Sequence, residues 1–328
     1  METVLVIGSN SFSGASFVKF LIEKGYFVIG ISRSQEPNKV FLPYKWHDFS
    51  SFKFYSFDLN KNFKEIVNLL KGYKPSYVVN FSAQSMVAES WISPEDWFIT
   101  NVVSTIKLHD VLRKCNFLKR YVHFSTPEVY GSCSGFVRED FVFNPSTPYA
   151  VSRAAADMSL KTFYNAYNFP VVTTRAANVY GPGQQLYRII PRTILFILLG
   201  RKLNLHGGGT STRSFIHIND VSDATYKIMM HGKNGDTYHI STNEVISIRN
   251  LVESICHKLN VNISEHIEYA EERVGKDSAY HLDSNKIRNE LNWYDSISLD
   301  KGINDCINWA NENLETLKKQ PFEYLHKS

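Results

Sequence analysis

The sequence predicts an α/β protein in which a doubly wound parallel sheet carries a smaller, interleaved C-terminal domain. Short apolar runs rich in β-branched residues alternate with helical patterns through the first half of the chain, which is typical of buried parallel strands joined by helices. A glycine-containing loop at residues 8–14 joins the first strand to the first helix. After Asn178 the alternation loosens into shorter mixed pieces, which indicates a second, smaller unit.

The expected elements follow from the spacing of apolar residues. Strands are predicted where apolar residues run without a break, and helices where they recur every three or four positions. The predicted strands are residues 4–7, 27–31, 78–80, 121–124 and 171–174. The predicted helices are residues 13–24, 63–71, 99–114, 150–166, 188–200, 220–231, 248–259 and 299–318. We therefore expect a sheet domain of residues 1–177, to which parts of 213–240 return, and a second domain of residues 178–328.

Composition indicates an ordinary globular chain. Of the 328 residues, 43% are hydrophobic and 21% are charged, and the net charge is +4. The basic residues are spread along the sequence, whereas nucleic-acid binders usually gather them on one face, so no nucleic-acid partner is expected. The most apolar stretch, residues 189–199, contains Pro191, Arg192 and Thr193 and is too short to span a bilayer.

The N-terminus and the cysteines indicate a cytoplasmic protein. Met1 leads directly into the first strand, without the charged and apolar regions of a signal peptide. The four cysteines lie far apart and none belongs to a Cys-x-x-Cys motif, which favours reduced structural thiols. Cysteines and histidines do not cluster with the spacing of a metal site, so we expect no metal, no membrane contact and a cytoplasmic location.

The loop at residues 8–14 predicts a dinucleotide site. Gly8 permits the tight turn after the strand, and Gly14 permits a close approach of helix and strand. Amides at the start of the helix then face a pyrophosphate, whose charge the helix dipole favours. Ser11 stands where a glycine is usual, and its hydroxyl is expected to donate to phosphate. Phe12 completes the candidate contacts of this loop.

The end of the second strand predicts which dinucleotide binds. An NAD site usually places Asp or Glu there for the ribose 2′-hydroxyl, but this chain has Ser32, Arg33 and Ser34. Arg33 with its flanking hydroxyls suits a 2′-phosphate, so we predict NADP as the cofactor and keep NAD as the alternative. Asp58 and Leu59 follow the third strand, where they are expected to reach the adenine.

Tyr149 and Arg153 form the predicted catalytic pair. Thr147 and Pro148 suit an N-cap and a first helical position, so Tyr149 begins a helix and shares a face with the residue four positions on. A cation about 6 Å away at an effective dielectric near 20 favours the phenolate by roughly 2–3 kcal/mol, which lowers its pKa by about two units. The sequence thus predicts that Tyr149 is a base near neutrality. A redox site of this design normally carries Lys here, and Arg is unable to relay a proton.

The strand at residues 121–124 delivers polar side chains to the same edge of the sheet. Ser125, Thr126 and Glu128 follow it directly, and doubly wound sheets bind ligands outside the carboxyl ends of their strands. Thr126 is placed to hydrogen-bond a substrate hydroxyl, and Glu128 to take a proton from a carbon beside a newly formed ketone. With Tyr149, this set predicts oxidation of a sugar hydroxyl followed by deprotonation of the neighbouring carbon.

With these residues the chain resembles the extended short-chain dehydrogenase/reductases, a Rossmann-like family, and in particular the nucleotide-sugar 4,6-dehydratases. The similarity covers nearly the whole length. Besides residues 8–14 and 149–153, it rests on residues 80–85, 100–102, 178–182, 213–218 and 273–277. Residues 83–85 and 32–34 look more like the GDP-sugar branch. The overall match is closest to the dehydratases that act on GDP-N-acetylglucosamine in legionaminic acid biosynthesis.

The resemblance implies a mechanism. Tyr149 removes the proton of the sugar 4-hydroxyl while hydride passes from C4 to the nicotinamide. The 4-keto group acidifies C5, Glu128 removes that proton, water leaves from C6, and hydride returns to C6. Glucose-type dehydratases carry Asp before the Glu as the acid, and GDP-mannose dehydratases carry Ser. Pro127 has no proton to give, so Glu128 is expected to serve first as base and then as acid.

The resemblance also implies binding residues and partners. The residues expected on the cofactor are Ser82, Ala83 and Gln84, with Tyr149 and Arg153. Those expected on the nucleotide sugar are Ser85, Thr126, Asn178, Arg213 and Arg273, the last three on its diphosphate. Residues 1–177 then form the dinucleotide-binding domain and residues 178–328 the nucleotide-sugar-binding domain. Members of the family form dimers, so a homodimer is expected.

Three alternatives stay open at this point. A 4-epimerase uses the same oxidation but needs no carboxylate at Glu128. A UDP-glucuronate decarboxylase also carries Glu after Ser at this site. A weakly active NADP-binding protein would explain Arg153 in place of Lys.

Overall fold

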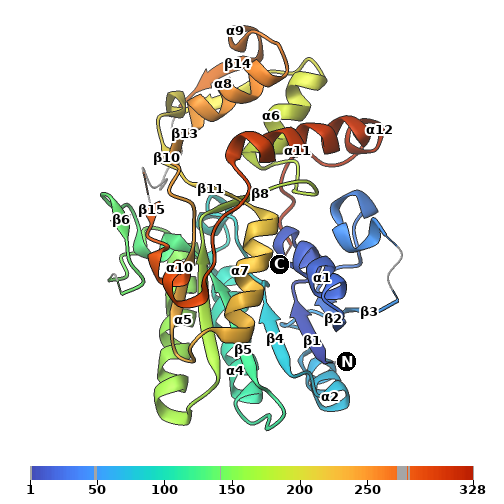
Figure 1. Cartoon of the computed structure of the whole chain (residues 1–328), viewed down its shortest axis with the longest axis vertical. Coiled ribbons are helices and arrows are strands. Elements are labelled where there is room, and N and C mark those ends of the chain that lie inside the picture. Colours follow the sequence, from blue (N-terminus) through green and yellow to red (C-terminus); the bar gives the residue numbers. More distant parts are fainter. Residues whose placement is uncertain (1, 48–49, 141, 272–278, 280, 328) are drawn as a thin grey trace.

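Seven parallel strands form the main sheet, in the order β12-β7-β5-β4-β1-β2-β3. The computed structural model describes residues 2–47, 50–140, 142–271, 279 and 281–327, and it places helices on both faces of this sheet (Figure 1). The strands are β1 (Thr3–Ile7), β2 (Phe27–Ser32), β3 (Phe52–Ser56), β4 (Tyr77–Asn80), β5 (Arg120–Ser125), β7 (Val171–Ala176) and β12 (Thr237–Ile240). The predicted doubly wound α/β fold is confirmed.

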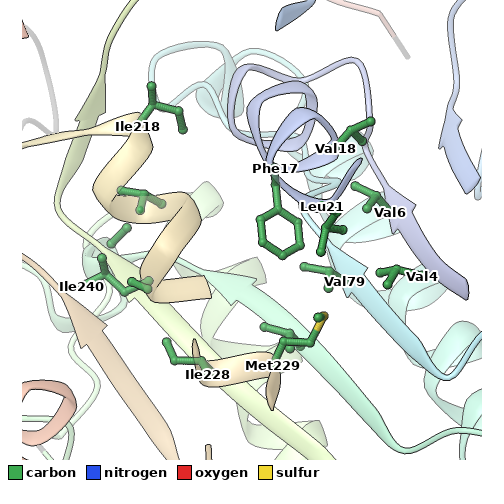
Figure 2. Packing of buried hydrophobic residues seen from close by; sticks show 14 of the residues in the cluster. Val4, Val6, Phe17, Val18, Leu21, Val79, Ile218, Ile228, Met229 and Ile240 are labelled. Carbon is green, nitrogen blue, oxygen red and sulfur yellow. The ribbon is translucent and has the colours of Figure 1, made fainter. Parts of the chain in front are cut away.

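The two faces of the sheet explain why its strands are apolar throughout. Successive side chains of a strand point to opposite faces. Val4 of β1 packs in one cluster with Phe17 of α1 and Met229 of α7 (Figure 2). Leu5, the next residue, packs in a second cluster with α2, α4 and α5 on the other face. The helices are α1 (Phe12–Glu23), α2 (Phe63–Tyr73), α4 (Thr105–Leu112), α5 (Pro148–Tyr167) and α7 (Ile218–His231).

The strand order creates a crevice between β1 and β4. The chain runs outward from β1 through β2 to β3 and then returns to β4 on the other side of β1. Connections therefore leave β1 and β4 in opposite directions, which is where ligands of such sheets bind. The loops that follow β1 and β4 lie close together here. A Cβ placed on Gly8 would lie only 2.8 Å from the Ser82 amide nitrogen.

A second unit with its own core lies above the sheet in the view of Figure 1. Its cluster includes Leu195 of α6, Leu205 of β9, Ile255 of α8 and Ile303 of α11. The two units are interleaved, because α7 and β12 follow part of the second unit in sequence and return to the sheet. The elements are α6 (Ile189–Leu198), β9 (Leu203–His206), α8 (Ile248–Lys258), β14 (Ile267–Ala270) and α11 (Leu299–Glu312).

Among the seven strands of the main sheet, β3 and β12 have no predicted residue range, and they form its two edges. An edge strand needs less apolar surface than a central one, and the half-exposed sequence of β3 lacks an uninterrupted apolar run. The predicted helix at residues 99–114 is also divided. It contains a π-helical segment, η4 (Ile99–Ser104), followed by α4, and the one at 299–318 divides into α11 and α12 (Leu314–Leu317).

Short elements complete the described chain. None of the helices in the described ranges combines the length and the apolar character that crossing a bilayer requires. The remaining elements are η1 (Lys39–Phe41), η2 (Pro43–Lys45), η3 (Glu89–Trp91), α3 (Pro94–Phe98), η5 (Pro127–Tyr130), β6 (Phe136–Val137), β8 (Asn178–Tyr180), η6 (Gly207–Gly209), β10 (Thr212–Arg213), β11 (Phe215–His217), β13 (Ile246–Ser247), α9 (Ile263–His266), β15 (His281–Leu282) and α10 (Asn285–Leu291).

Candidate active site

A cavity of about 920 Å³ lies where the carboxyl edge of the sheet meets the second unit. We call it the central cavity. Its lining joins the ends of β1, β4 and β5 to residues of α5, α6 and β9. Ligand pockets of proteins range up to about 1,000 Å³, so this cavity is large enough for more than a small metabolite. Among the described residues, His, Cys, Asp and Glu nowhere gather in a group of three that would hold a metal ion.

The loop after β1 has the backbone that a dinucleotide site requires. Gly8 has φ +80°, which favours glycine, and a Cβ on Gly14 would lie 2.1 Å from the Gly8 carbonyl oxygen. Ser11 is the N-cap of α1, and its Oγ accepts from the Gly14 amide. The Ser11 hydroxyl donates to the Gly8 carbonyl oxygen at 2.7 Å. In the cofactor-free chain the turn itself uses this proton, so the contact of Ser11 with phosphate stays a prediction.

Tyr149 lies at the start of α5, as predicted. Thr147 is the N-cap, with its side chain accepting from the Ala150 amide at 3.1 Å, and Pro148 is the first helical residue. Tyr149 is 7% exposed and lines the central cavity with Thr126 and Glu128. The end of β5 and the start of α5 thus place the predicted base, hydroxyl and carboxylate on one cavity wall.

The pKa of Tyr149 differs from the prediction. Burial raises this pKa to about 12, and the charge of Glu128 raises it as well. Arg153 lowers it, as do a hydrogen bond with Thr126 and the charge of Arg188. The predicted base near neutrality is wrong for the cofactor-free chain, because the cost of a buried phenolate outweighs the attraction of the two cations.

Arg153 lies one helical turn beyond Tyr149 and is 1% exposed. Its Nη2 donates to the Phe124 carbonyl oxygen and lies 3.3 Å from His123 Nε2. Its Nε and Nη1 are buried and have no hydrogen-bond partner. Arg153 lines the central cavity, so these donors fit an oxygen of a bound ligand, such as a ribose hydroxyl. Together with the turn at Gly8 and Gly14, they show that the site fits a nicotinamide dinucleotide.

A buried polar network lies beneath Arg153. Arg175 of β7 pairs with Asp157 of α5 at 2.7 Å, and the same carboxylate oxygen accepts from the Ser125 hydroxyl. Burial holds the pKa of His123 well below its usual range, and Arg153 and Arg175 lower it further, so this imidazole is neutral. Asp157 is thus the counter-ion of Arg175, while the neighbour of Arg153 is a neutral ring. The charge of Arg153 remains available to act on Tyr149.

The end of β2 differs from the arrangement that the sequence suggested. Arg33 Nη1 donates to the Lys327 carbonyl oxygen at 2.6 Å, and Gln84 Nε2 donates to the same oxygen at 2.7 Å. The guanidinium expected on a 2′-phosphate is therefore engaged by the chain itself. Ser32 Oγ accepts from the Asn10 amide and so ties the end of β2 to the dinucleotide loop.

The other predicted cofactor residues lie at the ends of β3 and β4. Asp58 accepts from the Asn60 amide in a turn, and Leu59 is buried in the core, so neither stands in the lining of the cavity. The Ser82 hydroxyl donates to Asn80 Oδ1. The lining includes Ala83, Gln84 and Ser85.

The far end of the cavity holds the expected substrate side. Asn178 lines it, whereas the described lining does not include Arg213, whose Nη1 donates to the Thr212 carbonyl oxygen. Arg273 lies outside the described residues. Sequence reasoning missed several polar lining residues, which have no motif around them: Gln184, Gln185, Arg188, Arg192, Asn204 and His206. Of these residues, Arg188 could have been found from the sequence, because it is a cation directly before an apolar helix in the part of the chain expected to bind a diphosphate.

The family model described as GDP-mannose 4,6 dehydratase matches residues 5–306. The chain belongs to this family. Its nucleotide-sugar 4,6-dehydratase relatives include the dTDP-glucose 4,6-dehydratase of Xanthomonas campestris pv. campestris, which is 28% identical over 94% of this chain and 93% of its own length. The predicted extended dehydrogenase/reductase family and dehydratase class are thereby confirmed.

Solved structures agree with this family. The dTDP-glucose 4,6-dehydratase DesIV of Streptomyces venezuelae, solved with NAD, has a TM-score of 0.89 at 28% identity, over 96% of this chain and 98% of its own. The dTDP-glucose 4,6-dehydratase of Bacillus anthracis, also solved with NAD, has a TM-score of 0.88 at 28% identity, over 97% and 99%. Both relatives contain NAD, so they lend no support to the predicted preference for NADP.

Proposed function

We propose that this chain converts a nucleotide-activated hexose into its 4-keto-6-deoxy form by removing water. The observation that carries the proposal is the shared wall of the central cavity, where Tyr149, Glu128 and Thr126 meet above the buried Arg153. A phenol beside a cation suits oxidation at C4, and a carboxylate beside the phenol suits proton removal at C5. An epimerase would need the phenol and the cation but not the carboxylate.

The protein residues have separate tasks in this reaction. Thr126 orients the sugar hydroxyl and Tyr149 takes its proton. Glu128 then removes the C5 proton, which the adjacent ketone has acidified. Pro127 lines the cavity but has no proton to give, so Glu128 returns its proton to the departing C6 hydroxyl. A bound nicotinamide would supply the acceptor for the C4 hydride and the donor of that hydride to C6. C5 then regains one proton, which balances the proton that Tyr149 took from the 4-hydroxyl.

We propose NAD as the cofactor, with NADP as the alternative. NAD is present in both solved relatives described above. Arg33, on which the NADP prediction depended, already donates to a backbone carbonyl. Gly8, Gly14 and the unpartnered donors of Arg153 would hold the pyrophosphate and the nicotinamide ribose.

We propose GDP-N-acetylglucosamine as the substrate, as in legionaminic acid biosynthesis. The support is the resemblance of residues 83–85 and 32–34 to the GDP-sugar branch and Pro127 in place of the usual acid. Asn178, with Arg213 and Arg273 as predicted, would hold the diphosphate. Arg188 is a further cation on the same cavity wall.

We also propose the division of labour that the sequence suggested. Residues 1–177, joined by parts of 213–240, would bind the dinucleotide, and residues 178–328 the nucleotide sugar. The return of β12 to the edge of the sheet beside β7 supports this division. A cytoplasmic location is supported by the free state of all four cysteines.

A homodimer is the proposed assembly. Exposed apolar side chains gather on η3, η4 and α5, which are neighbours in the fold. The exposed residues are Trp91, Ile92, Ile99, Val103, Val151 and Met158. A second copy covering this face would remove apolar surface from water. Sedimentation should give a dimer for the native chain and a monomer for Met158→Glu.

Mass analysis of products tests the proposed function. Purified protein with NAD⁺ should remove one water from GDP-N-acetylglucosamine, and GDP-mannose, UDP- and dTDP-hexoses serve as comparisons. Unchanged mass with altered stereochemistry would indicate the epimerase, loss of carbon dioxide from UDP-glucuronate the decarboxylase, and no turnover the weakly active binding protein.

The role of Glu128 has its own variant test. Glu128→Gln should stop water loss and the exchange of the C5 hydrogen with deuterated solvent. Glu265→Gln, on the exposed helix α9, is the matched control and should leave both unchanged. Retained dehydration by Glu128→Gln would refute the mechanism.

A further inference from the structure

Residues 320–327 form an extended segment that we call the strap. The strap has no helix or strand, and most of its side chains are exposed. Phe322 and Tyr324 are half-buried and alternate with exposed neighbours. Phe322 packs against Phe196 and Arg201. A segment without secondary structure, held by side-chain contacts, opens at a lower free-energy cost than a packed helix or strand. Opening of the strap therefore does not require the rest of the chain to unfold.

The strap contributes to the lining of the central cavity and contacts both units. On the side of the second unit, Glu323 pairs with Arg192 of α6 at 2.6 Å. On the side of the sheet, His326 Nε2 lies 2.7 Å from Asp96 Oδ2, and its ring stacks on Trp97 with centroids 5.0 Å apart. Glu323 also lines the cavity, and so does Tyr324, which lies between the two anchors in sequence. One short segment thus bridges both walls of the site.

Beyond His326, the strap contacts residues that the sequence assigned to the cofactor. The Lys327 carbonyl oxygen accepts from Arg33 Nη1 at 2.6 Å and from Gln84 Nε2 at 2.7 Å. Lys327 Nζ donates to Ser34 Oγ at 3.0 Å. Because both hydrogen bonds end on the Lys327 carbonyl oxygen, the donors of Arg33 and Gln84 converge on one acceptor atom. Arg33 also acts on the neighbouring Tyr324 phenol: burial raises the pKa of this phenol, and the charge of Arg33 partly offsets that rise.

The position of that acceptor is where the adenosine half of a dinucleotide should lie. Asn10 of the dinucleotide loop donates hydrogen bonds to the two residues that flank Arg33. Its backbone amide donates to Ser32 Oγ at 2.9 Å, and its side-chain amide donates to the Ser34 carbonyl oxygen at 3.0 Å. In sheets of this topology the end of the second strand binds the adenosine ribose. The Lys327 carbonyl oxygen therefore stands in for a ribose or phosphate oxygen, which would take the same two donors.

We propose that the strap is an intramolecular competitor of the dinucleotide. In the cofactor-free chain it occupies the acceptor site between Arg33 and Gln84, and it leaves that site when the adenosine ribose enters. The apparent affinity for the dinucleotide is then reduced by the fraction of molecules whose strap is closed. This inference rests on the proposed function only in assigning the cavity to a nicotinamide dinucleotide.

Hydrogen exchange on the full-length native protein tests the direction of the effect. Protein freed of bound nucleotide is compared with protein saturated with NAD⁺. Competition predicts that amides of the strap exchange faster with NAD⁺, while amides of residues 8–14 exchange more slowly. Slower or unchanged exchange of the strap would overturn the inference, because it would mean that the strap stays in place over bound cofactor.

Affinity provides the second test. The double variant Glu323→Ala/His326→Ala loosens both anchors and leaves every proposed catalytic residue in place. Both anchors are partly exposed side-chain contacts of modest strength, so we expect calorimetry to give a Kd for NAD⁺ about threefold to tenfold lower than in the native chain. Glu315→Ala, which removes an exposed pair with Lys318 on α12, is the control and should leave Kd unchanged.

The outcomes separate this inference from the proposed function. Unchanged or weaker NAD⁺ binding by the double variant would overturn the competition while leaving a dinucleotide enzyme intact. Failure of both proteins to bind NAD⁺ or NADP⁺ would overturn the proposed function and the inference together. Tighter binding with an unchanged product would support both.

Discussion

Replacing Arg153 by Met should slow the reaction by shifting the ionisation of Tyr149. The two residues are one helical turn apart, so we take about 6 Å as the separation of their charges. At an effective dielectric near 20, removing the cation costs the phenolate roughly 2–3 kcal/mol, or about two pKa units. Burial already raises the pKa of Tyr149 to about 12 in the cofactor-free chain, and Arg153 is among the groups that lower it. At neutral pH we expect kcat to fall about 100-fold.

The pH dependence identifies the cause of that loss. A base must be deprotonated, so the rate rises with pH on the limb that Tyr149 controls. Arg153→Met should move that limb upward by about two pH units. Arg153→Lys keeps the charge and should lose less than about tenfold. Initial rates of keto-sugar formation between pH 6 and 10 would measure both variants, and thermal unfolding would confirm that they fold.

Two results would refute this reasoning. If Arg153→Met slows the reaction equally at every pH, the cation does not act through the ionisation of Tyr149. If Arg153→Lys is as slow as Arg153→Met, the guanidinium geometry is required, which its contacts with Phe124 and His123 would explain.

Three further outcomes follow from the buried network and the glycine turn. Arg175→Met leaves Asp157 buried without its cation, so the free energy of unfolding should fall by about 3–5 kcal/mol in urea titrations. Arg249→Met, in an exposed pair, should leave the free energy of unfolding nearly unchanged. Burial lowers the pKa of His239 to about 3, below its unfolded value of about 6.5. The contribution of neutral, buried His239 to the free energy of unfolding is therefore full above pH 6.5. As the pH falls to 3, this contribution is lost by up to about 1.4 kcal/mol per pH unit. A urea midpoint that stays constant over that range would contradict this. Gly14→Ala places a Cβ 2.1 Å from the Gly8 carbonyl oxygen, so NAD⁺ binding by calorimetry should weaken at least tenfold, whereas Gly72→Ala, whose Cβ meets nothing within 4 Å, should bind normally.

The parts predicted from sequence are those that local chemistry determines. The turn at Gly8 and Gly14 and the cap of α5 by Thr147 need only neighbouring residues, and both lie where expected. The central strands were predicted because burial on both faces demands apolar residues at every position. The edge strand β3, half exposed, carries no such signal.

The parts that sequence did not predict depend on distant segments. The partner of Arg33 is the Lys327 carbonyl, nearly the whole chain away. The pKa of Tyr149 depends on how deeply the folded chain buries it, which a pattern of residues does not give. Arg188 reaches the same wall from the second unit. Long-range packing therefore decides the electrostatics of a site whose residues the motifs identify.

The late return of β12 has a consequence for how the chain is made. β7 is complete well before its outer neighbour β12 (Thr237–Ile240) is synthesised, because the start of the second unit lies between them. Until then β7 presents an open edge, with backbone groups ready to pair with any other strand. A nascent chain is thus most prone to misassociation between these two points of translation. A fragment that ends after β7 should therefore aggregate. The edge of β7 is covered only when β12, the last strand of the sheet, has been synthesised and has paired with it.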